Sequence, residues 1–254
     1  SSTVGGDLHA TATIGNITQN SEALAITGTT TLIPAASNAS IILGTTSNAF
    51  TGALIITTRD DDANGTDGDV TIHGGTTALV LGASTIEGDL ALTSTATGDD
   101  KITNNGTLNI RGTTTVSAIG VNVELNSVAN NFEGAVSING VDVTVADRND
   151  IDFTTSNIAG AFDLTAGGGV TDSGRLTIKD DTNINASSGN VVLNEGTNDF
   201  QRAEKIVGVN VTLVDTNAID LGASTVGGDY VVTAGGDITD SGVLNITGTS
   251  AFTA

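Results

Sequence analysis

The stretch Ser-Thr-Val-Gly-Gly-Asp-Tyr at residues 224–230 is the last of four copies of one pattern. The earlier copies are Ser-Thr-Val-Gly-Gly-Asp-Leu at 2–8, Ser-Thr-Ile-Glu-Gly-Asp-Leu at 84–90 and Ser-Asn-Ile-Ala-Gly-Ala-Phe at 156–162. Their third positions, which are always aliphatic, are separated by 82, 72 and 68 residues. Recurrence at such a period indicates an array of repeated structural units rather than one globular core.

The composition favours short strands joined by tight turns. Glycine accounts for 33 of the 254 residues, roughly twice its usual share, and Thr, Val and Ile alternate with Asn and Asp. The chain has no cysteine, which excludes disulfides and thiolate metal sites. It contains no apolar run long enough to span a bilayer, so we predict no membrane insertion. A net charge of −21 also disfavours nucleic acid as a partner.

Two further blocks recur in the same order within each unit. One holds a Leu-x-Ile pair, and the other is an Asn-x-Phe sequence. Both fit short strands whose alternate residues face a core, closed by Gly, Asn, Asp or Ser. The residues expected to form that core are Phe50, Phe132, Phe200, Leu108, Ile110, Leu176, Ile178, Leu244 and Ile246.

These observations predict an all-β fold, a right-handed parallel β-helix (solenoid) built from a repeat of ~70–80 residues. At roughly 19 residues per coil, the chain holds roughly thirteen coils spaced by ~4.8 Å. A closed sandwich or barrel offers no reason for four copies of one unit. We expect a single array over residues 1–254, with units at about 2–83, 84–155 and 156–223 and a partial unit at 224–254.

Acidic residues and histidines recur without an obvious metal-binding set. Equivalent acids are expected about four coils, or ~20 Å, apart, beyond the Debye length of ~8 Å, and so to be spread over a solvated face. His9 and His73 lack a second His or Cys nearby in the sequence and are expected to be exposed strand residues. The recurrent glycines are expected at cramped or left-handed corners.

An acidic insertion at residues 60–69 is the strongest candidate for a specific site. The spacing from Phe50 to Ile86 is 36 residues, whereas the two later units have 26 between the matching positions. The insertion opens with Asp, Asp and Asn at alternate positions followed by Gly, as calcium loops do, but Thr71 stands where a bidentate Glu is needed. A calcium site and a solvated hairpin both remain open, and no other cofactor is predicted. The candidate calcium ligands are Asp60, Asp62, Asn64, Asp67 and Asp69.

The combination of Asn-x-Phe-x-Gly-Ala, Ser-Thr-Val-Gly-Gly-Asp-Leu and Ile-Thr-Asp-Ser-Gly-x-Leu resembles the repeats of filamentous-haemagglutinin-type adhesins. These are giant surface exoproteins of Gram-negative bacteria, including those exported by two-partner secretion. The resemblance implies a β-helical shaft that is secreted or displayed on the bacterial cell surface and supports adhesion, aggregation or biofilm. Its implied partners are neighbouring repeats of the same or an identical chain and host-surface or matrix glycans.

We therefore expect a structural shaft or spacer segment of a large secreted adhesin. One alternative is a self-assembling extracellular filament or sheath subunit that stacks end to end. A third is a β-helix that binds or degrades polysaccharide. We expect no enzyme and name no catalytic residue, because the eight basic residues are scattered, the chain has one Tyr and no Trp, and no nucleophile elbow occurs.

Overall fold

A computed structural model describes residues 1–61, 67–98 and 101–254. The described residues form short strands and turns, and they contain no helix with the length and apolarity needed to cross a membrane. Contacts divide the chain into two compact units, residues 1–134 and 135–254. Each unit is described below by itself.

The first unit contains strands β1 to β17. Their bounds are Ser2–Val4 (β1), Leu8–Ala12 (β2), Ile17–Thr18 (β3), Leu24–Ile26 (β4), Thr30–Pro34 (β5), Ile41–Leu43 (β6), Ala49–Phe50 (β7), Leu54–Ile56 (β8), Val70–His73 (β9), Leu79–Leu81 (β10), Ser84–Ile86 (β11), Leu90–Thr93 (β12), Lys101–Asn104 (β13), Leu108–Ile110 (β14), Thr114–Ser117 (β15), Asn122–Leu125 (β16) and Asn131–Phe132 (β17).

The second unit contains strands β18 to β35. Their bounds are Val136–Gly140 (β18), Val143–Asp147 (β19), Ile151–Phe153 (β20), Ser156–Ile158 (β21), Phe162–Ala166 (β22), Val170–Asp172 (β23), Leu176–Ile178 (β24), Thr182–Ala186 (β25), Val191–Leu193 (β26), Asp199–Phe200 (β27), Ala203–Gly208 (β28), Val211–Asp215 (β29), Ile219–Leu221 (β30), Ser224–Val226 (β31), Tyr230–Ala234 (β32), Ile238–Asp240 (β33), Leu244–Ile246 (β34) and Ser250–Thr253 (β35).

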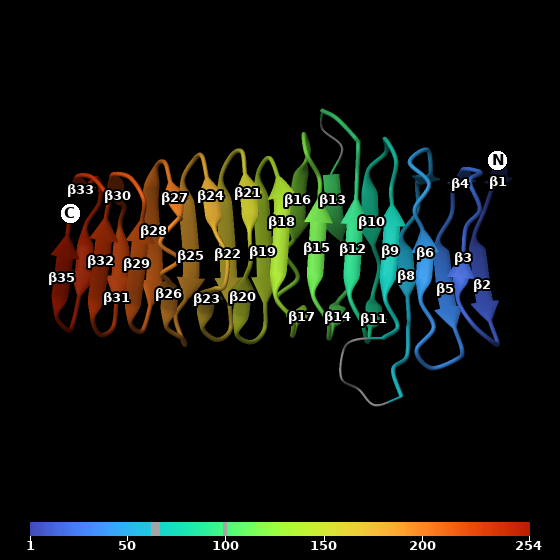
Figure 1. Cartoon of the computed structure of the whole chain (residues 1–254), viewed down its shortest axis with the longest axis horizontal. Coiled ribbons are helices and arrows are strands. Elements are labelled where there is room, and N and C mark those ends of the chain that lie inside the picture. Colours follow the sequence, from blue (N-terminus) through green and yellow to red (C-terminus); the bar gives the residue numbers. More distant parts are fainter. Residues whose placement is uncertain (62–66, 99–100) are drawn as a thin grey trace. The chain divides into compact units, whose positions relative to one another are not determined.

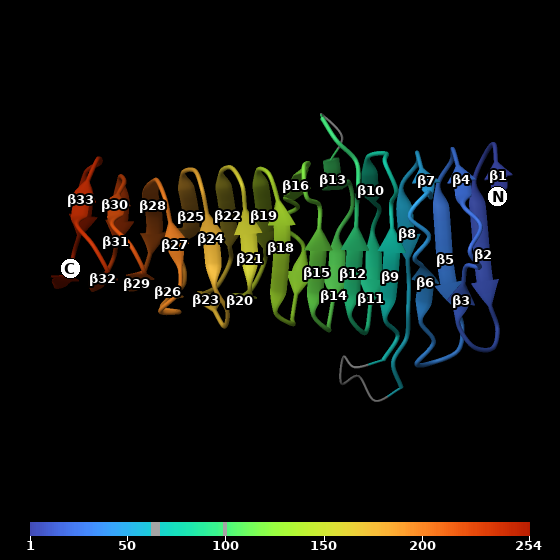
Figure 2. The ribbon, with the colours of Figure 1, turned by 45° about the horizontal axis from the view of Figure 1, so that its top comes forward.

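Within each unit, every strand pairs in parallel with the strand about one turn away along the chain. In the first unit, one stack runs β2-β5-β8-β10-β13-β16, and a second runs β3-β6-β9-β12-β15. Figures 1 and 2 both show β9, β12 and β15 side by side and pointing the same way. In the second unit the corresponding stacks are β19-β22-β25-β28-β30-β33 and β20-β23-β26-β29-β32-β35. Six stacked strands in each unit make a β-solenoid of about six turns per unit, which confirms the all-β parallel solenoid expected from the repeats.

One long strand per repeat pairs with two short strands of the next turn. Residues 203–204 of β28 pair with β30, whereas residues 207–208 of the same strand pair with β31. Strand β18 divides in the same way between β20 and β21. Each division starts a new short stack, so that β1-β4-β7, β11-β14-β17, β21-β24-β27 and β31-β34 follow one another at intervals of ten strands. The structural repeat is therefore ten strands, and its first strand carries the recurrent Ser-Thr-Val pattern.

The core consists of the alternate residues that point into each turn. In β22, Phe162, Leu164 and Ala166 are buried while the two residues between them are exposed. Because successive side chains of a strand point to opposite faces, this alternation places aliphatic residues inside and Thr, Asn and Asp outside. Aromatic rings fill wider layers, and the rings of Phe153 and Phe162 meet edge to face at 5.3 Å between centroids.

Seven of the nine core residues expected from the sequence are at most 2% exposed: Phe50, Phe132, Phe200, Leu108, Ile110, Leu176 and Ile178. Leu244 and Ile246, the other two, are half-buried in β34. Among the described strands, β34 pairs with β31 alone.

Candidate functional site

The recurrent polar residues gather at the corners of the turns, where they bond one turn to the next. Asn130 stands just before β17 and is fully buried. Its Oδ1 accepts a hydrogen bond from the backbone N–H of Leu108 at 3.0 Å, and its Nδ2 donates to the carbonyl oxygen of Leu125 at 3.1 Å. Asn48 and Asn198 accept in the same way from the first backbone N–H of β4 and β24, at 2.9 and 2.8 Å. At each of the three corners that precede Phe50, Phe132 and Phe200, a buried Asn side chain thus accepts a backbone N–H that would otherwise need a backbone carbonyl.

A buried serine joins each long strand to the two short strands that follow it. The Ser224 hydroxyl accepts a hydrogen bond from the backbone N–H of Ile206 at 3.0 Å and donates to the carbonyl oxygen of Gly222 at 3.1 Å. Ser84 and Ser156 make the same two bonds in their own turns. Backbone groups that the divided pairing leaves without a strand partner are satisfied by these hydroxyls.

Acidic and amide side chains form a second set of bonds between turns. In the second unit, Asn190 Oδ1 accepts from Asn210 N at 3.1 Å, and Asn210 Oδ1 accepts from Asp229 N at 2.9 Å. Asp229 Oδ1 then accepts from Thr249 N and from the Thr249 hydroxyl, each at 2.8 Å, and these two bonds lower the pKa of the Asp229 carboxyl. Four consecutive turns are linked at one corner by side chains that accept backbone N–H groups.

The first unit has a shorter version of this corner, in which Asp69 accepts from Asp89 N and Asp89 from Thr113 N. Asp89 and Asp229 are exposed, as the expectation of a solvated acidic face has it, and each also bonds a backbone N–H of the next turn. Comparing equivalent positions of the repeat missed the corner, because its members belong to successive turns and not to equivalent positions of successive repeats. The signal available in the sequence was an Asp or Asn about 20 residues before another Asp, Asn or Thr.

Glycines occur at the same corners because successive turns approach closely there. A Cβ added to Gly52 would overlap the carbonyl group of Gly28 in the turn below. Most corner glycines have negative φ, and the described glycines with positive φ are Gly15, Gly68, Gly75, Gly98 and Gly120. Close backbone approach, rather than a left-handed conformation, is therefore the main requirement.

Comparison with protein-family models also divides the chain into four consecutive repeats. The family model described as "Repeats of unknown function (DUF5649)" matches residues 1–57, 67–139, 140–206 and 208–254. The chain belongs to the DUF5649 repeat family. No curated protein and no solved structure matched it.

The two longest DUF5649 segments have the length of the structural repeat and start two strands before its first strand. Residues 67–139 run from β9 into β18, and residues 140–206 run from β19 into β28. Each segment therefore spans ten strands and ends on the long strand that divides its pairing. Among the residues that recur in this chain, Asn130, Ser224 and Leu108 pack the core or bond adjacent turns.

The predicted calcium site lies partly outside the described residues, because these exclude Asp62 and Asn64. Of the other predicted ligands, Asp69 accepts the backbone N–H of Asp89 at 2.9 Å, so one of its oxygens serves the corner of the DUF5649 turn. Asp60 and Asp67 also take part in interactions. Within the described part of the chain, no three His, Cys, Asp or Glu side chains form a group able to hold a metal ion. Calcium binding stays a prediction.

The two histidines differ in their surroundings. His9 is exposed, as expected. The expectation of exposure was wrong for His73, which is 9% exposed and accepts a hydrogen bond at Nδ1 from the backbone N–H of Gly75, at 3.0 Å. Burial lowers the pKa of His73 and favours the neutral ring. His73 thus closes the turn after β9.

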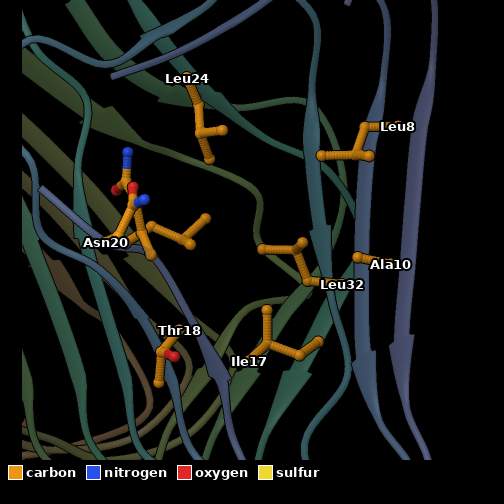
Figure 3. Close-up of a pocket in the computed structure, with 9 residues that line it drawn as sticks. Leu8, Ala10, Ile17, Thr18, Asn20, Leu24 and Leu32 are labelled. Atoms are coloured by element: carbon orange, nitrogen blue, oxygen red, sulfur yellow. The ribbon is translucent and has the colours of Figure 1, made fainter. Parts of the chain in front are cut away.

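An apolar cavity of about 490 Å³ lies in the first turn of the first DUF5649 segment. Figure 3 shows Leu8, Ala10, Ile17 and Leu32 directed into it. Leu8 is half-buried, whereas its equivalents in later repeats, Leu90, Phe162 and Tyr230, are buried. The apolar side chains that line the cavity belong to the first turns of the first unit. It can bury apolar side chains and offers no charged group for chemistry.

A polar groove of about 460 Å³ lies on the surface of the second unit. Glycines at positions 168, 169 and 189 line it together with the polar residues Asp150, Ser188 and Asn190. Asp150 Oδ1 is bonded to the N–H of Gly169 at 2.6 Å, and Asn190 belongs to the corner series described above. The groove presents hydroxyl, amide and carboxylate oxygens, which can hydrogen-bond a hydroxyl-rich ligand, but it has no aromatic platform.

Proposed function

We propose that this chain is a structural shaft or spacer segment of a large secreted bacterial surface protein that supports adhesion, aggregation or biofilm. The proposal rests on one observation, which is that the repeated residues form the contacts between successive turns. The recurrent Asn, Ser, Asp and Gly positions bond or pack one turn against the next. A repeat whose recurrent polar residues serve stacking is suited to providing length, as in other solenoids.

The resemblance of the repeats to filamentous-haemagglutinin-type adhesins supports the same proposal. Secretion is consistent with the absence of cysteine and the net charge of −21, which keep an extracellular chain free of thiol chemistry and soluble. Host-surface or matrix glycans are the proposed external partners. The groove formed by Asp150, Ser188 and Asn190 is the place where such a hydroxyl-rich ligand would bind.

The second candidate is a filament that grows when chains stack end to end. The apolar cavity at Leu8, Ile17 and Leu24 favours it, because another turn placed there would bury those side chains. The strands of an open turn also carry backbone groups that can pair with another chain. In the shaft, the covering turn belongs to the same polypeptide. In the filament it belongs to a second molecule.

Electron microscopy and sedimentation of the 254-residue protein at micromolar concentration would separate these functions. The shaft proposal predicts discrete particles both with calcium and with a chelator. Long fibres in both conditions would contradict it and favour the filament. Fibres that need calcium would instead assign the insertion at residues 60–69 as a calcium-dependent contact.

A pair of variants shows whether the cavity drives any assembly. Leu24→Asp places a charge in the wall of the cavity, whereas Ile42→Asp places the same charge on a residue that is 43% exposed on the outside of β6. Fibres that form through the cavity are lost in Leu24→Asp and kept in Ile42→Asp. Loss of fibres in both variants would show that added charge alone prevents assembly.

A further inference from the structure

One carboxylic acid is buried in the core of the second unit. Glu204 lies in β28 and is fully buried, and neither of its carboxyl oxygens has a hydrogen-bond partner within the described structure. The equivalent positions of the two earlier repeats are Leu54 and Val136, which are also fully buried. An acid has therefore taken the place of an aliphatic core residue in this repeat alone among the three.

Polar groups surround this carboxyl inside the core. Thr182 of β25 is its register partner, and the Thr182 hydroxyl is buried next to it. Tyr230 of β32, the only tyrosine of the chain, is fully buried with its hydroxyl near Ser224. Burial raises the pKa of the Tyr230 hydroxyl, and the neighbouring Ser224 lowers it. A charge on Glu204 would raise it further, so the two groups interact electrostatically.

The charged groups whose electrostatic effect reaches Glu204 are acids. They are Asp215 of β29, which is buried, Asp181 just before β25, which is exposed, and Asp220 of β30, which is half-buried. Lys205 follows Glu204 in β28 but points outward, is 48% exposed and pairs with Asp181 at 3.6 Å between Nζ and Oδ2. Burial raises the pKa of the Glu204 carboxyl well above its usual range; the Thr182 hydroxyl lowers it, and the three acids raise it further. The surroundings therefore favour the neutral acid.

We propose that Glu204 is a proton-dependent lock of the second unit: its neutral carboxyl is compatible with the packed turn of β28 to β32, and its ionisation loosens that turn. Ionisation would place a negative charge in the core, where the nearby Asp215, Asp181 and Asp220 disfavour it, while Lys205, the next residue of β28, points outward and pairs with Asp181. The proposal goes beyond a shaft of constant stability, since it makes one part of the solenoid responsive to pH.

The direction of the pH effect follows from linkage. In the unfolded chain Glu204 loses its proton near its ordinary pKa of 4.5, whereas the folded chain retains it to higher pH. Stability is therefore greatest below that value and falls as the pH rises toward the folded pKa. Between the unfolded and the folded pKa of Glu204, the titration of this residue increases the equilibrium constant for unfolding by up to about tenfold for each pH unit. The pKa of Asp215 is also raised, mainly by burial, so that a variant is needed to isolate Glu204.

The test compares the 254-residue protein with Glu204→Gln, which keeps the shape of the side chain and removes its titration. Glu133→Gln is the matched control, because it removes one charge from an exposed residue. Urea unfolding is followed between pH 4 and pH 9 by the fluorescence of Tyr230, which reports on this site because the chain has no Trp and no other Tyr. We expect the stability of the wild type to fall below that of Glu204→Gln progressively as pH rises, with Glu133→Gln following the wild type.

Infrared spectroscopy gives a second readout. The proposal predicts the C=O band of a protonated carboxyl group at neutral pH in the wild type and in Glu133→Gln, and its loss in Glu204→Gln. If Glu204→Gln does not fold, Glu204→Leu restores the residue of the first repeat and serves the same comparison. Absence of the band at neutral pH, or a stability difference that does not change with pH, would overturn the proposal.

Discussion

At the scale of single residues, the repeat consists of positions that serve the contact between turns. Asn130 satisfies one N–H and one carbonyl group that would otherwise be buried without partners. Each such loss costs about 1–3 kcal/mol. Gly52 has a different task, since its missing side chain allows the backbone of the next turn to approach. Both residue types therefore recur for a steric or hydrogen-bonding reason, and the family pattern can be explained without invoking a ligand.

The glycine argument can be tested with Gly52→Ala. The added methyl group would overlap the carbonyl group of Gly28, so that backbone must move. We expect a loss of about 1–3 kcal/mol in the free energy of unfolding, measured by chemical denaturation. Gly44→Ala is the control, because its Cβ would meet nothing within 4 Å. Equal effects of the two substitutions would show that close approach is not the reason for Gly52.

At the scale of elements, the long strand that divides its pairing defines the repeat. Strand β28 continues through residues that pair first with β30 and then with β31. The corner between these two short strands interrupts the ladder, and the Ser224 hydroxyl fills the interruption. The repeat contains ten strands, which is not a multiple of three. The division accounts for this number, because one long strand pairs with two short strands of the next turn.

Ser224→Ala tests this role. The substitution removes the acceptor of the buried Ile206 N–H, and we expect it to lower the free energy of unfolding by about 1–3 kcal/mol. The neighbouring Thr225→Ala alters an exposed side chain of the same strand and is expected to change stability by less than about 0.5 kcal/mol. Thermal or urea unfolding of both variants would check the difference. A neutral Ser224→Ala would mean that the divided pairing needs no hydroxyl.

At the scale of the whole molecule, each turn contacts its neighbours, and stability follows from those contacts. Turns with a neighbour on both sides bury their inward residues completely, as β23 and β24 do at Val170 and Leu176. In β34 the inward residues Leu244 and Ile246 are half-buried, and Val243 beside them is 70% exposed. The protection of backbone amides from hydrogen exchange should therefore vary along the chain.

Hydrogen exchange measured by mass spectrometry would detect this variation in the 254-residue protein. We expect peptides that cover β33 to β35 to exchange faster than peptides that cover β23 to β26, because the former have packed neighbours on one side only and open with a smaller free energy. Exchange of the unfolded chain supplies the intrinsic rates. Uniform protection from β23 to β35 would show a unit that opens as a whole and would contradict independent opening of the outer turns.

The sequence by itself determined the all-β solenoid, the repeat and most of the core, because period-two alternation and recurrent turn residues are local signals. Phe50, Leu108 and Ile178 lie inside, as this alternation predicts. Only the tertiary structure decided which turn each polar residue bonds, since partners such as Asp229 and Thr249 are 20 residues apart and meet through strand register. It alone showed that Glu204 points into the core. Register decides which face a strand residue occupies, and a shift of one residue would have placed that acid in water.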